Sequence, residues 1–149
     1  RRSAFLQNPS PAWSPDGTKI AFESDMGRET GIVDIFTISP AGSGLTNLTS
    51  NIINGDNYIY PSWSPDGTKL SVNLLTFPYT NYSIAVMNAD GTGLTIIVTG
   101  LPSPHYETSW SPDGTRIAYT ESGSIKWVAA NGSAGGTIVT NGWDADWQH

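Results

Sequence analysis

The chain has 149 residues, which suits one ordinary domain, and it has no cysteine, so disulfide bonds and thiolate metal sites are excluded. Its formal net charge of −6 and its 7 Lys and Arg residues disfavour a nucleic-acid partner or an anionic-membrane patch. With 16 Gly, 10 Pro and no long apolar run, we expect many turns, few helices and no membrane insertion.

The first 50 residues predict one short strand and then two hairpins. Residues 1–8, RRSAFLQN, predict a single strand, and residues 11–22, PAWSPDGTKIAF, predict a hairpin. Ser-Pro-Asp-Gly suits a type I turn whose Gly is left-handed, which makes a bulged hairpin. Ile20 and Phe22 share one face of its second strand. Residues 34–49, DIFTISPAGSGLTNLT, predict a second hairpin around a Gly-rich turn.

Both hairpins recur twice further along the chain. PSWSPDGTKLSV (61–72) and TSWSPDGTRIAY (108–119) repeat the first one. SIAVMNADGTGLTIIV (83–98) and SIKWVAANGSAGGTIV (124–139) align with the second one without gaps, although Gly135 replaces a Leu. Four antiparallel strands in each period of about 45 residues, with a Trp signature, indicate the blades of a β-propeller. We expect the Trp of each repeat to fill the space between neighbouring blades.

The chain ends with WDADWQH, residues 143–149, which predicts another single strand because Trp147 stands where a fourth repeat would begin. The predicted fold class is therefore all-β, a partial propeller in one domain. Residues 1–8 and 143–149 would be strands of an incomplete blade. The three full blades are expected at approximately residues 11–49, 61–99 and 108–141.

The repeated residues resemble the TolB-type, WD40-like β-propeller repeat. Its hallmark is W-S-P-D-G-[ST]-[KR]-[ILV]-[AV]-[FY], and WSPDGT occurs here at 13–18, 63–68 and 110–115. The resemblance covers three copies and most of the chain, and it implies a propeller fold. The family includes periplasmic TolB, propeller domains of prolyl-oligopeptidase-type peptidases, some lyases, and many envelope or secreted proteins. It therefore implies a periplasmic, cell-envelope or extracellular location, but the fold does not choose an activity.

The number of blades departs from that of a complete family member. Closed propellers usually have roughly four to eight blades. Three blades alone would leave unpaired sheet edges and exposed inter-blade faces. We favour the C-terminal part of a longer ring, and since Arg1 is not a natural start we expect sequence upstream. Two alternatives stay open. Two copies would pair into six blades, or the terminal strands would complete blades of neighbouring chains in an oligomer or fibre.

The loops predict where a partner binds. Within a blade the first-to-second and third-to-fourth strand turns lie at one rim, and they are short. The opposite rim has the long, irregular loops, where binding usually occurs on a rigid scaffold. The aromatic side chains and hydrogen-bond acceptors of these loops suit a protein or carbohydrate partner. The alternative is that the aromatic side chains pack the loops against the body of the protein. The loops are 24–32, 50–60, 74–82 and 100–107. The predicted partner-binding residues are Tyr58, Tyr60, Phe77, Tyr79, Tyr82, His105 and Tyr106, near Asp25, Glu29, Asp56 and Glu107.

The motifs of catalysis and metal binding are missing from the sequence, so we expect no catalytic residue, cofactor or metal. A G-x-S-x-G elbow and a phosphate-binding Gly loop before a helix are both absent. His105 is the only interior histidine and is typical of a hydrogen-bonded loop residue. NADGTG (88–93) resembles a calcium loop but lacks the later acidic ligands. Turn chemistry explains the Asp of each WSPDGT segment.

Three sequons predict N-glycosylation at positions that we expect to be exposed, namely Asn47, Asn81 and Asn131. Together these features favour a non-enzymatic, extracytoplasmic binding or scaffold propeller that engages a protein or glycan through the long-loop rim. One alternative is a structural subunit that self-assembles by exchange of its terminal strands. Another is the propeller part of a larger hydrolase or lyase whose catalytic residues lie elsewhere.

Overall fold

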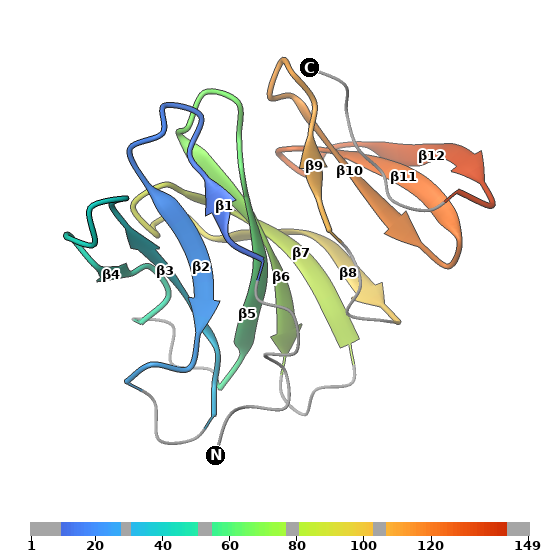
Figure 1. The fold of residues 1–149 in the computed structure, drawn as a ribbon. Coiled ribbons are helices and arrows are strands. Elements are labelled where there is room, and N and C mark those ends of the chain that lie inside the picture. Colours follow the sequence, from blue (N-terminus) through green and yellow to red (C-terminus); the bar gives the residue numbers. More distant parts are fainter. Residues whose placement is uncertain (1–9, 28–30, 51–54, 77–80, 103–106, 143–149) are drawn as a thin grey trace.

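The computed structural model describes residues 10–27, 31–50, 55–76, 81–102 and 107–142, and every regular element in these ranges is a β-strand. The strands form three four-stranded antiparallel sheets, which lie in chain order across Figure 1, from blue through green to red. The predicted all-β class with four-stranded blades is confirmed. In this described part of the chain we find no helix with the length and apolar character to cross a membrane.

The strands of each sheet follow one another in space as they do in sequence, so each sheet is a meander. The first sheet contains β1 (Ala12–Trp13), β2 (Ile20–Ser24), β3 (Asp34–Ile38) and β4 (Thr46–Asn47). The second contains β5 (Asn57–Trp63), β6 (Lys69–Thr76), β7 (Asn81–Asn88) and β8 (Thr95–Leu101). The third contains β9 (Ser109–Trp110), β10 (Arg116–Glu121), β11 (Ser124–Ala129) and β12 (Gly135–Thr140).

The WSPDGT segments form the same tight turn three times, and these turns lie at the top of Figure 1. In the first turn the Gly17 amide donates to the Ser14 carbonyl at 2.9 Å, and Gly17 has a φ of 68°. Asp16 accepts from the Ser14 hydroxyl at 2.6 Å and from the Thr18 amide at 3.0 Å. These hydrogen bonds lower the pKa of Asp16 to about 2. The bulged hairpin turn expected from the sequence is therefore confirmed.

The core consists of two clusters, and each joins two successive sheets. We call the face of a sheet toward the preceding sheet its leading face, and the opposite face its trailing face. The leading face of the second sheet packs on the trailing face of the first, with Trp63, Leu70, Val72 and Met87 against Ala21, Ile35 and Leu48. The third sheet packs on the second in the same way, with Trp110, Ile117, Tyr119 and Val128 against Ile84, Val86 and Leu101. Since each fully buried side chain of this size contributes about 1.5–3 kcal/mol, the inter-sheet contacts dominate the stability.

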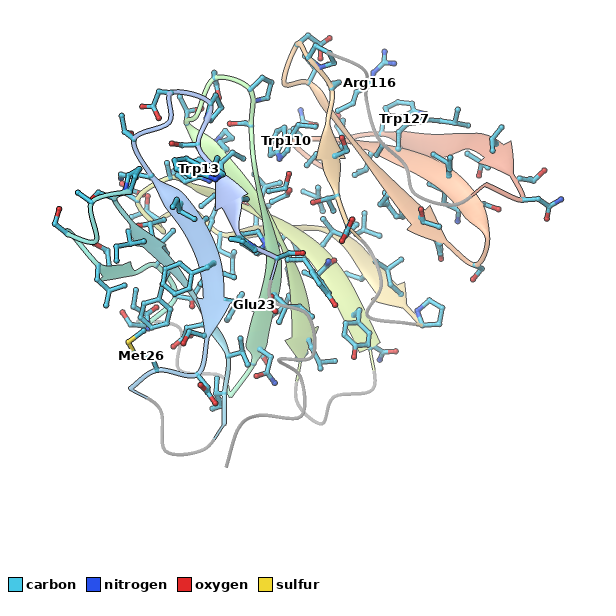
Figure 2. The ribbon with its side chains drawn as sticks, in the orientation of Figure 1. Trp13, Glu23, Met26, Trp110, Arg116 and Trp127 are labelled. Carbon is cyan, nitrogen blue, oxygen red and sulfur yellow. The ribbon has the colours of Figure 1, made fainter. Side chains whose placement is uncertain are left out.

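Two of the three repeat tryptophans lie between sheets as predicted. Trp63 is 8% exposed, and its Nε1 donates to the Ala12 carbonyl at 3.1 Å. Trp110 is 4% exposed, and its Nε1 donates to the Ser62 carbonyl at 3.2 Å. The prediction is wrong for Trp13, which is 59% exposed. The reason is that β1 and β2 belong to the first sheet, so no sheet within the described ranges covers their leading face (Figure 2).

Candidate functional site

A buried carboxylate from the first sheet meets the second sheet at the long-loop rim. Glu23 lies near the end of β2, on the trailing face, and is 4% exposed (Figure 2). Its Oε2 accepts a hydrogen bond from the Tyr60 amide at 2.8 Å. Burial raises the pKa of Glu23, and the bond from Tyr60 opposes that rise. This contact ties the inner edge of the second sheet to the first.

The backbone of β5 is irregular where it meets Glu23. The register with β6 shifts between Ile59 and Ser62, which marks a β-bulge. Tyr60 lies inside the bulge with a φ of 54°, in the left-handed region that a bulky residue rarely adopts. Pro61 follows it, and an edge strand tolerates that proline because β5 is at the inner edge of its sheet. A conformation of this kind costs about 1–3 kcal/mol and persists only where its surroundings hold it.

The side chains around Tyr60 carry negative charge and phenol groups. Burial raises the pKa of Tyr60, and the charges of Glu23 and Glu107 raise it further. Tyr82, near the start of β7, is half-buried, and burial raises its pKa as well. These four residues, Glu23, Tyr60, Tyr82 and Glu107, are called the rim cluster below. They come from all three sheets or their connections, so the cluster depends on how the sheets stack.

The rim cluster combines two carboxylates, buried Glu23 and exposed Glu107, with the half-buried phenol groups of Tyr60 and Tyr82. It suits a ligand group that donates hydrogen bonds and is neutral or positively charged. It does not offer a metal site, because no group of three or more His, Asp or Glu side chains that could hold a metal occurs in the part of the chain described.

The structure corrects the position of one predicted binding residue. Tyr58 was expected on a loop, but it lies in β5 and is 1% exposed. Its amide donates to the Val33 carbonyl at 2.9 Å, and the Val33 amide donates to the Asn57 side chain at 2.7 Å. These bonds to the segment directly before β3 accompany a strand that begins further upstream than expected, at Asn57 rather than near residue 61. Tyr58 is therefore a core residue.

The other predicted binding residues divide into two groups. Tyr60 and Tyr82 are half-buried at the rim and belong to the rim cluster. Phe77, Tyr79, His105 and Tyr106 lie outside the residues that the structure describes. Sequence reasoning missed Glu23. A signal for it was present, because Glu23 alternates with Ala21 on a strand and so lies on a face that packs in the interior.

The sequons differ in accessibility. Asn81 and Asn131 are exposed, as expected. The expectation of exposure is wrong for Asn47, which is half-buried in β4. The Nδ2 of Asn47, the atom to which a glycan would be attached, donates to buried Asp34 at 2.9 Å. That side chain stabilises the pairing of β3 and β4 instead.

Comparison with known proteins agrees with the repeat and the fold. No family model matches the chain. A segment of 41 residues is 51% identical to the Tol-Pal system protein TolB of Syntrophus aciditrophicus (strain SB), and the match covers 28% of this chain and 8% of that protein. The resemblance of these repeats to the TolB type is thus confirmed.

Solved TolB structures have the same fold. The chain superposes on TolB from Acinetobacter baumannii with a TM-score of 0.69 at 21% identity, over 84% of this chain and 30% of that one. For a TolB structure from Agrobacterium tumefaciens the TM-score is 0.65 at 18% identity, over 87% of this chain and 48% of that one. The chain thus spans less than two thirds of the proteins that it matches, and three of its sheets correspond to part of a larger propeller.

Proposed function

We propose that this chain, built from TolB-type propeller repeats, is a non-enzymatic binding or scaffold module whose partner binds at the rim cluster. The observation that supports it most is the backbone of Tyr60, held at a φ of 54° by the bond to buried Glu23. Holding a strained aromatic residue beside Tyr82 and Glu107 preorganises a surface before any partner arrives, which lowers the entropic cost of binding.

The chemistry of the rim cluster favours a partner that presents hydrogen-bond donors. The net charge of −6 repels polyanions, whereas phenol groups and carboxylates attract the Lys and Arg side chains of a protein or the hydroxyl and amino groups of a sugar. We further propose an extracytoplasmic location, on the basis of the resemblance to TolB-type proteins. Protein and glycan are the two partner classes that the experiment below separates.

Site-specific photo-crosslinking in the cells that produce the protein tests this proposal. A photoreactive phenylalanine replaces Tyr82 at the long-loop rim, and in a matched variant it replaces Ala41, which is exposed in the Gly-rich turn at the opposite rim. We expect adducts other than the chain with itself from position 82 and few from position 41. Mass spectrometry of the adduct then identifies a protein or a glycan. Equal amounts of adducts with other molecules from both positions, or such adducts from position 41 alone, would show that the rim cluster is not the binding surface.

A further inference from the structure

Three contacts are repeated at both inter-sheet junctions of the chain. The leading face of the first sheet carries the equivalent residue for each of them. The first is the indole hydrogen bond. Trp63 donates to Ala12, the residue before Trp13, and Trp110 donates to Ser62, the residue before Trp63. Trp13 occupies the same place in its repeat but is largely exposed. In an equivalent junction between the first sheet and a third sheet, the acceptor for Trp13 would be the carbonyl of Ser109, the residue before Trp110.

The second repeated contact involves the Gly-rich turn between the third and fourth strands. A Cβ atom on Gly91 would overlap the Leu48 carbonyl of the preceding sheet, and one on Gly132 would lie 3.3 Å from the Ile97 side chain. The two turns therefore press against equivalent places in the sheet before them, Leu48 directly after β4 and Ile97 in β8. Gly42 is the equivalent residue of the first sheet, and a Cβ atom there would meet nothing within 4 Å.

The third contact involves the WSPDGT turns. A Cβ atom on Gly67 would lie 3.7 Å from Pro15 of the preceding turn, and one on Gly114 would lie 3.8 Å from Pro65. The equivalent Gly17 has open space at that position. All three contacts thus recur in the same form at both junctions. Among the residues that the structure describes, none of the three is made on the leading face of the first sheet.

That leading face carries apolar side chains whose equivalents in the second sheet are buried. Trp13 corresponds to Trp63, Ile20 to Leu70 and Phe22 to Val72 in the gapless alignment of the repeats. The three residues of the second sheet are buried, whereas Trp13 is exposed and the other two are half-buried. Leu45 is exposed as well. An apolar face of this kind on a soluble domain marks an interaction surface.

The trailing face of the third sheet is the complement. Ile138 corresponds to Leu48 and Ile97, on which the following sheets press their Gly-rich turns, yet Ile138 is 52% exposed. Ile125 corresponds to the fully buried Ile35 and is only half-buried. Val139 pairs with Ile125 and is exposed. The third sheet therefore presents the acceptor side of the same junction that joins sheets one to two and two to three.

We propose that the leading face of the first sheet binds the trailing face of the third sheet of a second copy, so that two chains pair head to tail through two such junctions. In the pair Trp13 donates to Ser109 of the partner subunit, and the turn at Gly42 presses on Ile138 of the partner subunit. A second copy is the occupant because its third sheet presents a trailing face equivalent to the two trailing faces that are already covered within the chain. A contact that is head to tail closes when the rotation permits it. One chain covers 48% of the Agrobacterium tumefaciens structure, and for this reason we propose a closed pair rather than a longer ring.

Sedimentation velocity of the full chain over a range of concentrations, together with native mass spectrometry, tests the pairing. We expect a dimer for the wild type. Trp13→Glu and Ile138→Glu, at two exposed positions on opposite faces, should each weaken pairing at least about 30-fold, the effect of losing a central contact in an interface. Ile96→Glu changes a comparably exposed isoleucine on β8 of the middle sheet and should leave pairing unchanged. Circular dichroism spectra that match that of the wild type verify that the variants fold.

A mixture of the two variants distinguishes this arrangement from the pairing of like faces, leading face to leading face or trailing face to trailing face. Because each chain keeps the face that the other has lost, an equimolar mixture of Trp13→Glu and Ile138→Glu should form mixed dimers with one intact junction, at concentrations where each variant alone is mostly monomeric. A monomeric wild type at about 100 μM, a Trp13→Glu variant that pairs normally, or a mixture without mixed dimers would each overturn the proposal. Polymers longer than two chains would overturn closure into a pair.

Discussion

Truncation of a buried repeat tryptophan tests whether the sheets are held together as described. In Trp110→Ala the lost side chain lies between the second and third sheets, and large-to-small changes of this kind cost about 3–5 kcal/mol. The Nε1 bonds to the Ser62 carbonyl and to the Ser71 hydroxyl at 3.0 Å are lost too, which adds about 1 kcal/mol, since Ser71 keeps Thr108 as a partner at 2.7 Å. The sum of about 4–6 kcal/mol is a large part of the 5–15 kcal/mol typical of a domain.

Urea unfolding at equilibrium, followed by circular dichroism, measures this loss. All variants are made in the Ile138→Glu background so that pairing does not contribute. Trp13→Ala is the matched control, because the same hexapeptide places that indole in solvent, and it should cost less than about 1 kcal/mol. Trp110→Phe should fall between the two. Equal losses for Trp13→Ala and Trp110→Ala, or a loss below about 1.5 kcal/mol for the latter, would refute the reasoning.

Three further outcomes are expected. Burial raises the pKa of Glu23 above its ordinary 4.5, so the folded state holds that proton more tightly than the unfolded state. The free energy of unfolding should therefore fall as pH rises from 4.5 through the raised pKa, and Glu23→Gln should remove that fall in urea titrations at successive pH values. Asp113 has a pKa of about 2 against an ordinary 3.8, so its contribution is present above pH 3.8 and lost as pH falls toward 2. Asp113→Asn should flatten the acid-induced loss of stability, and an unchanged acid profile would contradict this. Gly91→Ala and Gly42→Ala are compared in the Ile138→Glu background, so that pairing does not contribute. Both impose the same left-handed strain, at φ values of 86° and 78°, but only the former also meets Leu48. Gly91→Ala should thus lower the thermal midpoint further, and equal midpoints would argue against the turn contact.

Local chemistry explains what the sequence predicts well. The Ser-Pro-Asp-Gly turn is closed by hydrogen bonds between residues two to five apart, such as that from the Lys19 amide to the Ser14 hydroxyl at 2.9 Å. Its three copies therefore predict three identical hairpins. Alternation of apolar residues such as Leu70 and Val72 then assigns the second strand of each hairpin. The blades follow from these short-range features together with the period of the repeat.

Long-range contacts explain what the sequence does not predict. The sequence around Tyr58 suggests an Asn-rich loop, yet hydrogen bonds with Val33, directly before β3, hold this segment in a strand. The meeting of Glu23 with Tyr60 spans 37 residues and depends on the stacking of two sheets. Trp13 and Trp63 stand in identical hexapeptides, and their burial differs because, within the described ranges, a preceding sheet covers Trp63 but not Trp13. The rim cluster is of this long-range kind.

The affinity of the partner identified by crosslinking tests the central claim most directly. Biolayer interferometry compares its binding to the wild type, to Tyr82→Ala and to the control Ala41→Ser on the opposite rim. We expect Tyr82→Ala to bind at least tenfold more weakly, as for loss of an aromatic anchor, while Ala41→Ser binds like the wild type. Wild-type affinity for Tyr82→Ala, with its fold intact, would contradict the assignment of binding to the rim cluster.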